Sequence, residues 1–271
     1  MAENQDSQDV RQWWSTSIID MEPGKINLRG RPVQDLIGNV SFPQMIWLMV
    51  QGKLPSEDEA RLFEAALVAG VDHGPQAPSI AAARMAATCG VGLNNVIATG
   101  VNMLGDIHGG AGEQCAELYM DISARIESGM SLEEAVREGL DHWRSGHGKL
   151  VSGFGHRFHK PIDPRAPRLM ALVREAAASG TVRGLFADIG EAVQNELSRQ
   201  NNHRPIPMNI DGATAVIFCE LGFPPPLSRG FFCISRSVGI LAHGWEQMQQ
   251  GGRNKGPMPP RFLPLYKPPT E

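Results

Sequence analysis

Apolar residues recur at helical spacing along nearly the whole chain. One stripe near the start comprises Leu36, Ile37, Val40, Ile46 and Met49. Another, near the end, predicts one long helix through Phe231, Ile234, Val238, Leu241 and Trp245. No clear run of alternating apolar and polar residues stands out, and no internal repeat is found. The pattern therefore predicts an all-α fold.

Capping residues mark where several of these helices begin. Ser56 and Glu59 have the spacing of a capping box, in which each side chain bonds a backbone N–H at the helix start. Ser131 and Glu134 repeat that spacing before a further apolar stripe. A third helix start is predicted where prolines suit a first helical turn, at Pro164 and Pro167.

Five segments interrupt the helical pattern, and they carry most of the residues suited to chemistry. Functional groups concentrate on loops held by a rigid scaffold. The last segment contains six prolines, so it is expected to run extended, as a disordered tail or as an arm lying on another subunit. The segments are residues 72–78, 105–112, 152–164, 201–212 and 251–269.

Composition restricts the class of protein. A chain of 271 residues can form one large domain or two interlocked ones, and 20% charged with 42% hydrophobic residues is ordinary for a soluble globular protein. The net charge of −4 provides no global basic field, so no nucleic-acid partner is expected. The four cysteines form no CxxC pair, and the start of the chain lacks the pattern of a signal peptide. No apolar run is long enough for a membrane span. We therefore expect a cytoplasmic protein with reduced thiols.

A histidine lies among glycines in the segment Gly105–Glu113, just before a predicted helix. The start of a helix carries partial positive charge and free N–H groups. That environment favours a neutral imidazole at His108, which could donate a hydrogen bond to a carbonyl or enolate oxygen. The alternative is a glycine-rich turn with an incidental histidine.

The segment Ser152–Lys160, followed by Asp163-Pro-Arg165, concentrates positive charge beside two glycines. Glycine lets the backbone approach a ligand closely. The loop therefore suits carboxylates or the phosphates of a nucleotide, and a solvated basic loop is the alternative. The basic residues are His156, Arg157, His159, Lys160 and Arg165.

Two further charged residues have apolar neighbours. Asp211 precedes the apolar run at 216–218, and partial desolvation there would raise its pKa and suit it to act as a base. The alternative is that Asp211 caps a helix. Arg236 lies inside the long apolar helix, where either a buried ion pair or a bound carboxylate would satisfy its charge.

Metal and nucleotide motifs are not found. The spacing of the four histidines between residues 142 and 159 matches no zinc signature, and no cysteine or carboxylate completes a set. The chain contains neither GxxxxGK[ST] nor GxGxxG. We therefore predict no bound metal and neither a P-loop nor a Rossmann nucleotide site.

The order of these motifs resembles the citrate synthase superfamily: GDIHGGAGE, SGFGHR with DPR, NIDG, then SRSVGILAH. The N-terminal segment RPVQDLIGNVSFPQMIWLMVQGKLPSEDE is similar to that family as well. The resemblance implies a large helical domain of residues 1–111 and 219–271, and a small helical domain of residues 112–218. It also implies an active site in the cleft between them, and a homodimer or larger assembly.

The resemblance implies roles for individual residues. His108 would hold the thioester enol oxygen, His156 would act on the oxaloacetate carbonyl, and Asp211 would be the base at the acetyl methyl group. His73, Arg165 and Arg236 would bind the organic acid. An arginine from the neighbouring subunit has two candidates, Arg253 and Arg261. The loop that meets coenzyme A (CoA) would comprise Ser152, Gly153, Phe154, Gly155 and Arg157.

The chain is shorter than ordinary citrate synthases, and DHGP, NIDGATAVIF and SRSVGILAHGWEQ resemble the citryl-CoA lyase module of ATP-citrate lyase and the small citryl-CoA lyases. The expected reaction is therefore cleavage of citryl-CoA to acetyl-CoA and oxaloacetate. It needs a CoA thioester as substrate and no bound cofactor, and a citryl-CoA synthetase would be a partner. The alternatives are a compact citrate or methylcitrate synthase that also hydrolyses the thioester, and a non-catalytic regulator that binds CoA or citrate.

Overall fold

The computed structural model describes residues 5–269, and the chain divides into two compact units, residues 1–64 and 65–271. The division falls inside one helix, α4 (Glu57–Gly70). The predicted division into domains of residues 1–111 with 219–271, and of residues 112–218, stays a prediction.

The first unit contains a small antiparallel sheet that the sequence pattern did not predict. Strands β1 (Ile19–Glu22) and β2 (Lys25–Leu28) form a hairpin, and β3 (Arg31–Pro32) pairs with β2. Pro23 and Gly24 connect the first two strands, and Gly24 has the positive φ that such a tight turn favours. Strands this short leave too few alternating positions for a period of two to be recognised.

Along the chain of this unit, α1 (Gln5–Trp13) precedes the sheet. Helices α2 (Val33–Leu36) and α3 (Phe42–Gln51) and the first part of α4 follow it. The stripe from Leu36 to Met49 belongs to two helices rather than one. Ser41 starts α3 with a capping box, and Ile37, just after α2, is 71% exposed. The predicted capping box at Ser56 and Glu59 is present at the start of α4.

The second unit consists of helices. After the end of α4 come α5 (Pro78–Ala87), α6 (Leu93–Asn102), α7 (Ala111–Glu127), α8 (Leu132–His147), α9 (Arg165–Ala178), α10 (Leu185–Gln200), α11 (Ile210–Glu220) and α12 (Pro225–Gln249). The all-α prediction is confirmed for this unit. Its predicted helix starts are confirmed too: Ser131 caps α8 through a capping box, and α9 begins at Arg165, directly after Pro164.

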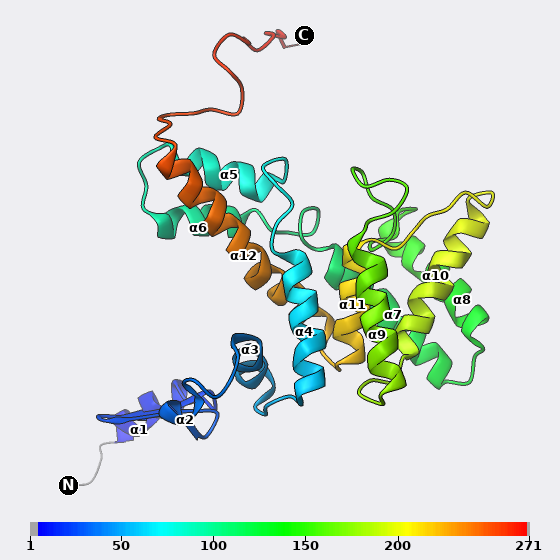
Figure 1. The fold of residues 1–271 in the computed structure, drawn as a ribbon, viewed down its shortest axis with the longest axis horizontal. Coiled ribbons are helices and arrows are strands. Elements are labelled where there is room, and N and C mark those ends of the chain that lie inside the picture. The colour runs from blue at the N-terminus through cyan, green and yellow to red at the C-terminus, as the bar shows by residue number, and fades with distance from the viewer. Residues whose placement is uncertain (1–4, 270–271) are drawn as a thin grey trace. The chain divides into compact units, whose positions relative to one another are not determined.

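Two groups of helices share the long helix α12 (Figure 1). Helix α12 packs against α5 and α6 near its C-terminal end, and against α7 and α11 as well. Helix α11 packs against α7, α9 and α10, and its residues Ala213, Val216 and Ile217 are completely buried. Because α11 is buried, the residues at its N-terminus lie inside the unit, where they contact a loop from another part of the chain.

The face that α12 buries differs from its apolar stripe. Ser235, Arg236 and Gly239 are buried, whereas Val238 and Trp245 are more than half exposed. Gly239 lies so close to the backbone that an added Cβ would lie 2.2 Å from the carbonyl oxygen of Val71. Small residues therefore bring α12 against the loop after α4, and much of the apolar stripe faces outward.

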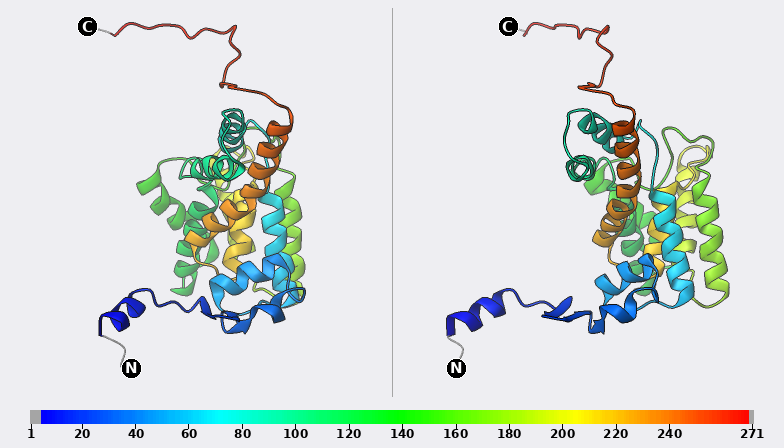
Figure 2. Two further views of the ribbon diagram at one scale, coloured as in Figure 1. Left: turned by 90° about the vertical axis from the view of Figure 1, so that its left-hand side faces the viewer. Right: turned by 60° about the vertical axis from the view of Figure 1, so that its left-hand side comes forward.

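The segment after α12 extends away from the helices in every view (Figures 1 and 2). Its beginning is held to the end of α5, because the N–H groups of Asn254 and Lys255 donate to Thr88. The prediction that this segment is not helical is confirmed for the described residues. It does not run extended throughout, because bends and a turn interrupt it, and in that turn the N–H of Phe262 donates to the carbonyl oxygen of Pro259. None of the helices described has the length and apolarity to cross a membrane.

Candidate active site

The predicted CoA loop and the start of α11 are joined by backbone hydrogen bonds. The N–H of Gly155 donates to the carbonyl oxygen of Pro207 at 2.7 Å, and the N–H of Asn209 donates to that of Gly153 at 3.0 Å. The Asn209 side chain adds a bond from Nδ2 to the carbonyl oxygen of Gly155 at 2.6 Å. These three hydrogen bonds therefore join two motifs that are far apart in sequence, SGFGHR and NIDG.

Two glycines make this junction possible. A Cβ on Gly153 would lie 2.4 Å from Cys115 Sγ and 2.9 Å from the Cα of Gly212. A Cβ on Gly212 would lie 2.5 Å from the carbonyl oxygen of Gly153. Gly153 also has a φ of +90°. Only glycine at both positions lets the loop and α11 approach this closely.

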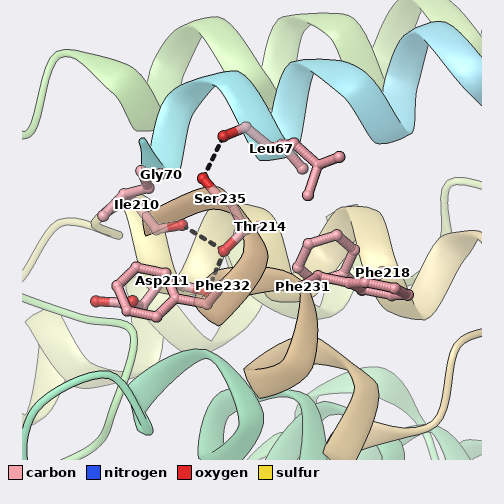
Figure 3. Close-up of a pocket in the computed structure, with 10 residues that line it drawn as sticks. Leu67, Gly70, Ile210, Asp211, Thr214, Phe218, Phe231, Phe232 and Ser235 are labelled. Carbon is pink, nitrogen blue, oxygen red and sulfur yellow. Dashed lines mark hydrogen bonds between the residues drawn. The ribbon is translucent and has the colours of Figure 1, made fainter. Parts of the chain in front are cut away.

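Asp211 does not cap α11. The side chain of Asn209 accepts hydrogen bonds from the N–H groups of Asp211 and Gly212, so Asn209 is the N-cap. Asp211 instead lines a pocket between the end of α4, the start of α11 and α12 (Figure 3). Burial raises the pKa of the Asp211 carboxyl, and the charges of Arg165 and Arg236 oppose that rise. The pocket is lined by Ala66, Leu67, Gly70, Ile210, Asp211, Thr214, Phe218, Phe231, Phe232 and Ser235.

His108 lies in the loop between α6 and α7, and its ring is held from the start of α5. The backbone N–H of Ser79 donates to Nε2 at 3.2 Å, and the Ser79 hydroxyl lies 2.9 Å from the same nitrogen. A nitrogen that accepts a backbone N–H carries no proton, so the network assigns the proton to Nδ1. Burial and then the charges of Arg236 and Arg157 lower the pKa of His108. The ring is therefore a neutral donor, as the sequence predicts, although α5 rather than the following helix supplies the N–H.

Side chains outside the recognised motifs hold the His108 loop in place. Arg229 of α12 contacts Asp106 Oδ1 at 2.6 Å and also pairs with Glu113. Gln114 donates to the carbonyl oxygen of Asp106 at 3.2 Å and accepts from the Ser152 hydroxyl at 2.6 Å. Ser152, predicted to meet CoA, is thus connected to the His108 loop. The sequence alone did not identify Arg229 and Gln114 as site residues, because the residues that they contact lie on other segments of the chain.

The ring of His156 is fixed by the turn that follows it. Its Nδ1 accepts hydrogen bonds from the N–H groups of Phe158 at 3.0 Å and His159 at 2.9 Å. The neutral ring therefore carries its proton on Nε2. Burial lowers the pKa of His156, and the nearby Asp163 carboxylate opposes that effect. His156 thus presents its Nε2–H as a hydrogen-bond donor to a ligand.

Three histidines gather at one point, although they are distant in sequence. His73, from the loop after α4, approaches His159 with an Nε2–Nε2 distance of 3.1 Å. The ring of His156 lies 4.6 Å from that of His159 and 5.3 Å from that of His73, measured between centroids. Sequence spacing could not place His73 in this cluster, because it precedes the others by more than eighty residues.

This histidine cluster could hold a metal ion by distance alone, since one ligand atom from each ring lies within 4.8 Å of the others. Each ring would need a bare nitrogen directed at the ion. In His156 the bare nitrogen is Nδ1, which already accepts two backbone hydrogen bonds. Metal binding would have to break those bonds, and the expectation of no bound metal stays a prediction.

Arg165 pairs closely with Asp163 at the start of α9. Its Nε lies 2.9 Å from Oδ1 and its NH2 lies 2.8 Å from Oδ2, and the Asp163 side chain is fully buried. Asp163 also accepts the backbone N–H of Ile210 at 3.1 Å. Burial raises the pKa of Asp163, but these donors outweigh it and lower the pKa to about 2. Asp163, missed as a site residue, thereby joins α9 to the start of α11.

Arg236 has no carboxylate in ion-pair contact among the residues described here. Its Nε donates to the carbonyl oxygen of Gly70 at 3.0 Å, and its guanidinium lies 4.8 Å from the centre of the Phe232 ring. The residue is only 5% exposed. Of the two alternatives predicted for Arg236, a buried ion pair is not found among the described residues, so its charge remains available to an anionic ligand.

The remaining predicted residues differ in their placement. Arg157 is exposed on the CoA loop, and Phe154 forms an isolated backbone bridge with Met208. Arg253 and Arg261 are exposed on the segment after α12, and Arg261 lies over the Phe262 ring. The single chain does not bring these two arginines to its own histidine cluster. Their contribution to a neighbouring subunit stays a prediction.

Comparisons with known proteins all point to one family. The family model "Citrate synthase, C-terminal domain" matches residues 10–69 and 55–261. The citrate synthase of Haloferax volcanii is 29% identical over 74% of this chain and 50% of its own length. That of Heyndrickxia coagulans is 30% identical over 80% of this chain and 54% of its own. The chain thus spans about half the length of the curated relatives it matches.

Among solved structures, citryl-CoA lyase from Hydrogenobacter thermophilus is similar, with a TM-score of 0.81 and 35% identity. The match covers 95% of this chain and 96% of that one. ATP citrate lyase from Methanothrix soehngenii, in complex with citrate and coenzyme A, has a TM-score of 0.76 over 99% of this chain and 45% of its own. Its 20% identity supports the fold alone. From the matched family model and the arrangement of the motifs, the chain belongs to the citrate synthase family.

Proposed function

We propose that this protein cleaves citryl-CoA reversibly to acetyl-CoA and oxaloacetate. The observation that carries the proposal is the similarity to a citryl-CoA lyase at 35% identity along nearly the full length of both chains. The citrate synthases that match are about twice as long as the matched region. Synthase activity is the second candidate, supported by sequence identities close to 30%.

Cleavage breaks the bond between the methylene carbon next to the thioester and the carbon that bears the hydroxyl. The bond electrons move into the thioester carbonyl and form an enolate, while the hydroxyl loses its proton and becomes the ketone of oxaloacetate. The enolate carbon then takes a proton and gives acetyl-CoA. Three groups are needed: a donor at the enolate oxygen, a group at the hydroxyl oxygen and an acid at the carbon.

His108 suits the enolate oxygen, because its neutral ring has Nε2 occupied by Ser79 and a proton on Nδ1. Asp211 suits the carbon, because burial raises its pKa and so favours the protonated carboxyl that can deliver a proton. In the synthetic direction the same carboxylate removes a proton from acetyl-CoA. The two residues thus form the acetyl half of the proposed site.

His156 is proposed to act at the hydroxyl oxygen. In the tautomer fixed by Phe158 and His159, its Nε2–H donates a hydrogen bond to that oxygen. Accepting the hydroxyl proton, as the resemblance implies, requires a bare Nε2. The proton must then be held on Nδ1, and the turn of residues 156–159 must release that nitrogen. We therefore expect this turn to open during the reaction.

Arg165 and Arg236 are proposed to orient the carboxylates of the organic acid. A CoA thioester is the substrate, and the reaction as written uses no bound cofactor. An enzyme that activates citrate as its CoA thioester, a citryl-CoA synthetase, would supply the substrate. Assembly as a homodimer or larger, and a cytoplasmic location, belong to the same proposal.

The decisive assay offers purified protein citryl-CoA without added metal or nucleotide and identifies the products by mass. Acetyl-CoA with oxaloacetate is the expected result. Free citrate with CoA as the main products would replace the lyase by a synthase that hydrolyses the thioester. Tight CoA binding without reaction of any acyl-CoA would favour the non-catalytic regulator.

A further inference from the structure

The loop that carries His108 is a tight turn that closes around Asp106. The N–H of Gly105 donates to the carbonyl oxygen of His108 at 2.9 Å. A Cβ on Gly110 would lie 2.8 Å from the Cα of Asp106 and 2.9 Å from its carbonyl oxygen, so the backbone of the loop is closely packed on itself. A displacement of Asp106 must therefore displace the neighbouring backbone, including that of His108.

Asp106 is held from two other elements. Its carboxylate pairs with Arg229 of α12 at 2.6 Å, and Arg229 also pairs with Glu113 in the first turn of α7. Its carbonyl oxygen accepts a hydrogen bond from Gln114 Nε2 at 3.2 Å. The Asp106 side chain is 75% exposed, so these contacts rather than burial fix where the residue lies.

The contact at the carbonyl oxygen of Asp106 determines the orientation of the Gln114 amide. A carbonyl oxygen only accepts hydrogen bonds, so the amide nitrogen of Gln114 must face Asp106. The amide oxygen then faces Ser152, whose hydroxyl donates to it at 2.6 Å. A serine hydroxyl has one proton, and here that proton is used within the protein. While this bond is present, the Ser152 hydroxyl cannot donate to a phosphate or carbonyl group of CoA.

We propose that Ser152 and Gln114 are positioning residues that hold His108 through the backbone of Asp106. Ser152 orients the Gln114 amide, and Gln114 holds the Asp106 carbonyl group, two residues before His108. This inference rests on the proposed function, in which His108 donates to the enolate oxygen. It gives Ser152 a different role from the contact with CoA that the family resemblance implies. The contacts lie within one chain and involve no arginine expected from a neighbouring subunit.

The proposed reaction depends on the direction of the His108 Nδ1–H. Ser79 holds Nε2, which fixes the tautomer but contacts the ring at a single nitrogen. The backbone that carries the ring sets the rest of its orientation, and a hydrogen bond weakens steeply as it departs from linearity. The enolate oxygen gains its charge only during the reaction, so a misdirected donor lowers the rate more than it lowers binding of the ground state. Loss of Ser152 or Gln114 should therefore lower turnover and leave CoA affinity unchanged.

The test compares the exchange rate of the acetyl-CoA methyl protons with CoA affinity in the full chain. Exchange in deuterated water is followed by NMR with saturating acetyl-CoA and a saturating, non-reacting oxaloacetate analogue, and calorimetry measures CoA affinity. Ser152→Ala and Gln114→Met should each slow exchange by about 10- to 100-fold, since a misplacement of about 1 Å can cost that much. Both should retain the wild-type affinity for CoA. Ser152→Thr keeps the hydroxyl and should restore most of the exchange rate.

Two controls separate positioning from general damage. Ser145→Ala removes a hydroxyl on α8 that donates to the carbonyl oxygen of His142 at 2.7 Å, and it should change neither quantity. The double variant of Ser152→Ala with Gln114→Met should exchange about as slowly as the slower single variant, because both residues act through one contact. Losses that multiply in the double variant would overturn the proposal. So would a Ser152→Ala variant with weakened CoA affinity and an unchanged exchange rate, which would make Ser152 a CoA ligand.

Failure of this inference can be told apart from failure of the proposed function, because the NMR signals of the His108 ring are observed without substrate. Ser152→Ala and Gln114→Met should shift these signals, and Ser145→Ala should not. Normal exchange and unshifted signals in both variants of a protein that cleaves citryl-CoA would reject the positioning role alone. Shifted signals in a protein that neither exchanges methyl protons nor cleaves citryl-CoA would reject the lyase and retain the positioning of His108.

Discussion

At the scale of single residues, helix capping and the proposed chemistry belong to two different residues at the start of α11, Asn209 and Asp211. The Asn209 side chain accepts hydrogen bonds from the first free N–H groups of the helix, and Asp211 lines the pocket. The division separates a structural task from a chemical one, so each can be tested by changing one residue.

We expect Asp211→Asn to lower turnover by about 10²–10⁴-fold, because a positioned acid or base contributes that much. Helicity and oxaloacetate binding should persist, since Asn209 still caps the helix. Exchange of the acetyl-CoA methyl protons with deuterated water, followed by NMR with a non-reacting oxaloacetate analogue, isolates the proton transfer. Equal exchange rates in the variant and the wild type would remove Asp211 as the base.

Arg236 is tested by two variants that separate charge from packing. Arg236→Leu removes both the charge and the donor to the Gly70 carbonyl oxygen, whereas Arg236→Gln can keep a donor without the charge. Losing a charge-assisted contact to a buried partner costs about 2–5 kcal/mol of binding. Both variants should therefore weaken oxaloacetate binding, measured by calorimetry. Only Arg236→Leu should lower stability clearly, and unchanged affinity in Arg236→Gln would contradict the assignment.

At the scale of elements, Asp163 connects the start of α9 to the start of α11 through Arg165 and Ile210. Its pKa is about 2 in the folded chain, below the ordinary value of 3.8. The ionised carboxyl therefore stabilises the fold above about pH 4, and that contribution is lost as the pH falls towards 2. Urea denaturation at a series of acidic pH values should reveal this loss.

Asp163→Asn should lower the unfolding free energy at neutral pH by about 3–5 kcal/mol, the usual cost of breaking a buried ion pair. Asp188→Asn is the matched control, because Asp188 pairs with Arg174 at a solvent-exposed position. An exposed pair contributes about 0–1 kcal/mol. Similar losses in both variants would contradict a structural role for Asp163.

The junction of the CoA loop with α11 can be tested with two glycines of positive φ. Gly153→Ala brings a Cβ against Cys115 and Gly212, whereas an added Cβ on Gly155 would have Ile206 at 3.9 Å as its neighbour. Gly155→Ala therefore carries only the backbone strain, about 1–2 kcal/mol. Gly153→Ala should lower both the midpoint of thermal unfolding and CoA affinity much more. Equal effects would mean that close packing does not fix the loop.

Much of the architecture follows from local sequence. The capping boxes at Ser56 and Ser131 correctly located helix starts, because capping involves residues only three positions apart. The short hairpin at residues 19–28 was missed, since each strand has four residues and shows no clear alternation. The stripe from Leu36 to Met49 was interrupted by the cap at Ser41, which the apolar spacing alone did not reveal.

The candidate site was predicted as a set of motifs, but its contacts were not. Local spacing cannot show that Ser79 holds His108, or that His73 meets His159, because these partners come together only through the packing of α5 and the loops around it. The sequence around Asp163 does carry a local indication of its role. An aspartate side chain can accept the backbone N–H of the residue two positions later, which here is Arg165.

At the scale of the whole molecule, apolar surface remains uncovered in the single chain. Ile234, Val238, Leu241 and Trp245 lie exposed along α12, and Phe262, Leu263, Leu265 and Tyr266 lie exposed on the final segment. Apolar surface of this extent is typical of an interface with another subunit. These residues support the proposed homodimer and an arm that crosses between subunits.

Ending the chain at Gly251 should abolish activity and weaken the dimer, while circular dichroism remains unchanged because no described helix lies beyond that residue. Activity assays and analytical ultracentrifugation measure the two effects. Arg253→Ala and Arg261→Ala then show whether one arginine accounts for the loss of activity. Full activity in the truncated chain would exclude both from the site.

The orientation of the His156 ring depends on peptide groups, with a consequence for how this loop can vary. The donors to Nδ1 are the backbone N–H groups of Phe158 and His159, which every amino acid except proline provides. Alanine scanning of these positions would leave the tautomer intact and would therefore overlook the interaction. Only proline, or an ester bond introduced in place of the amide, removes a donor. The tautomer of His156 is thus independent of the side chains at 158 and 159, as long as neither residue is proline.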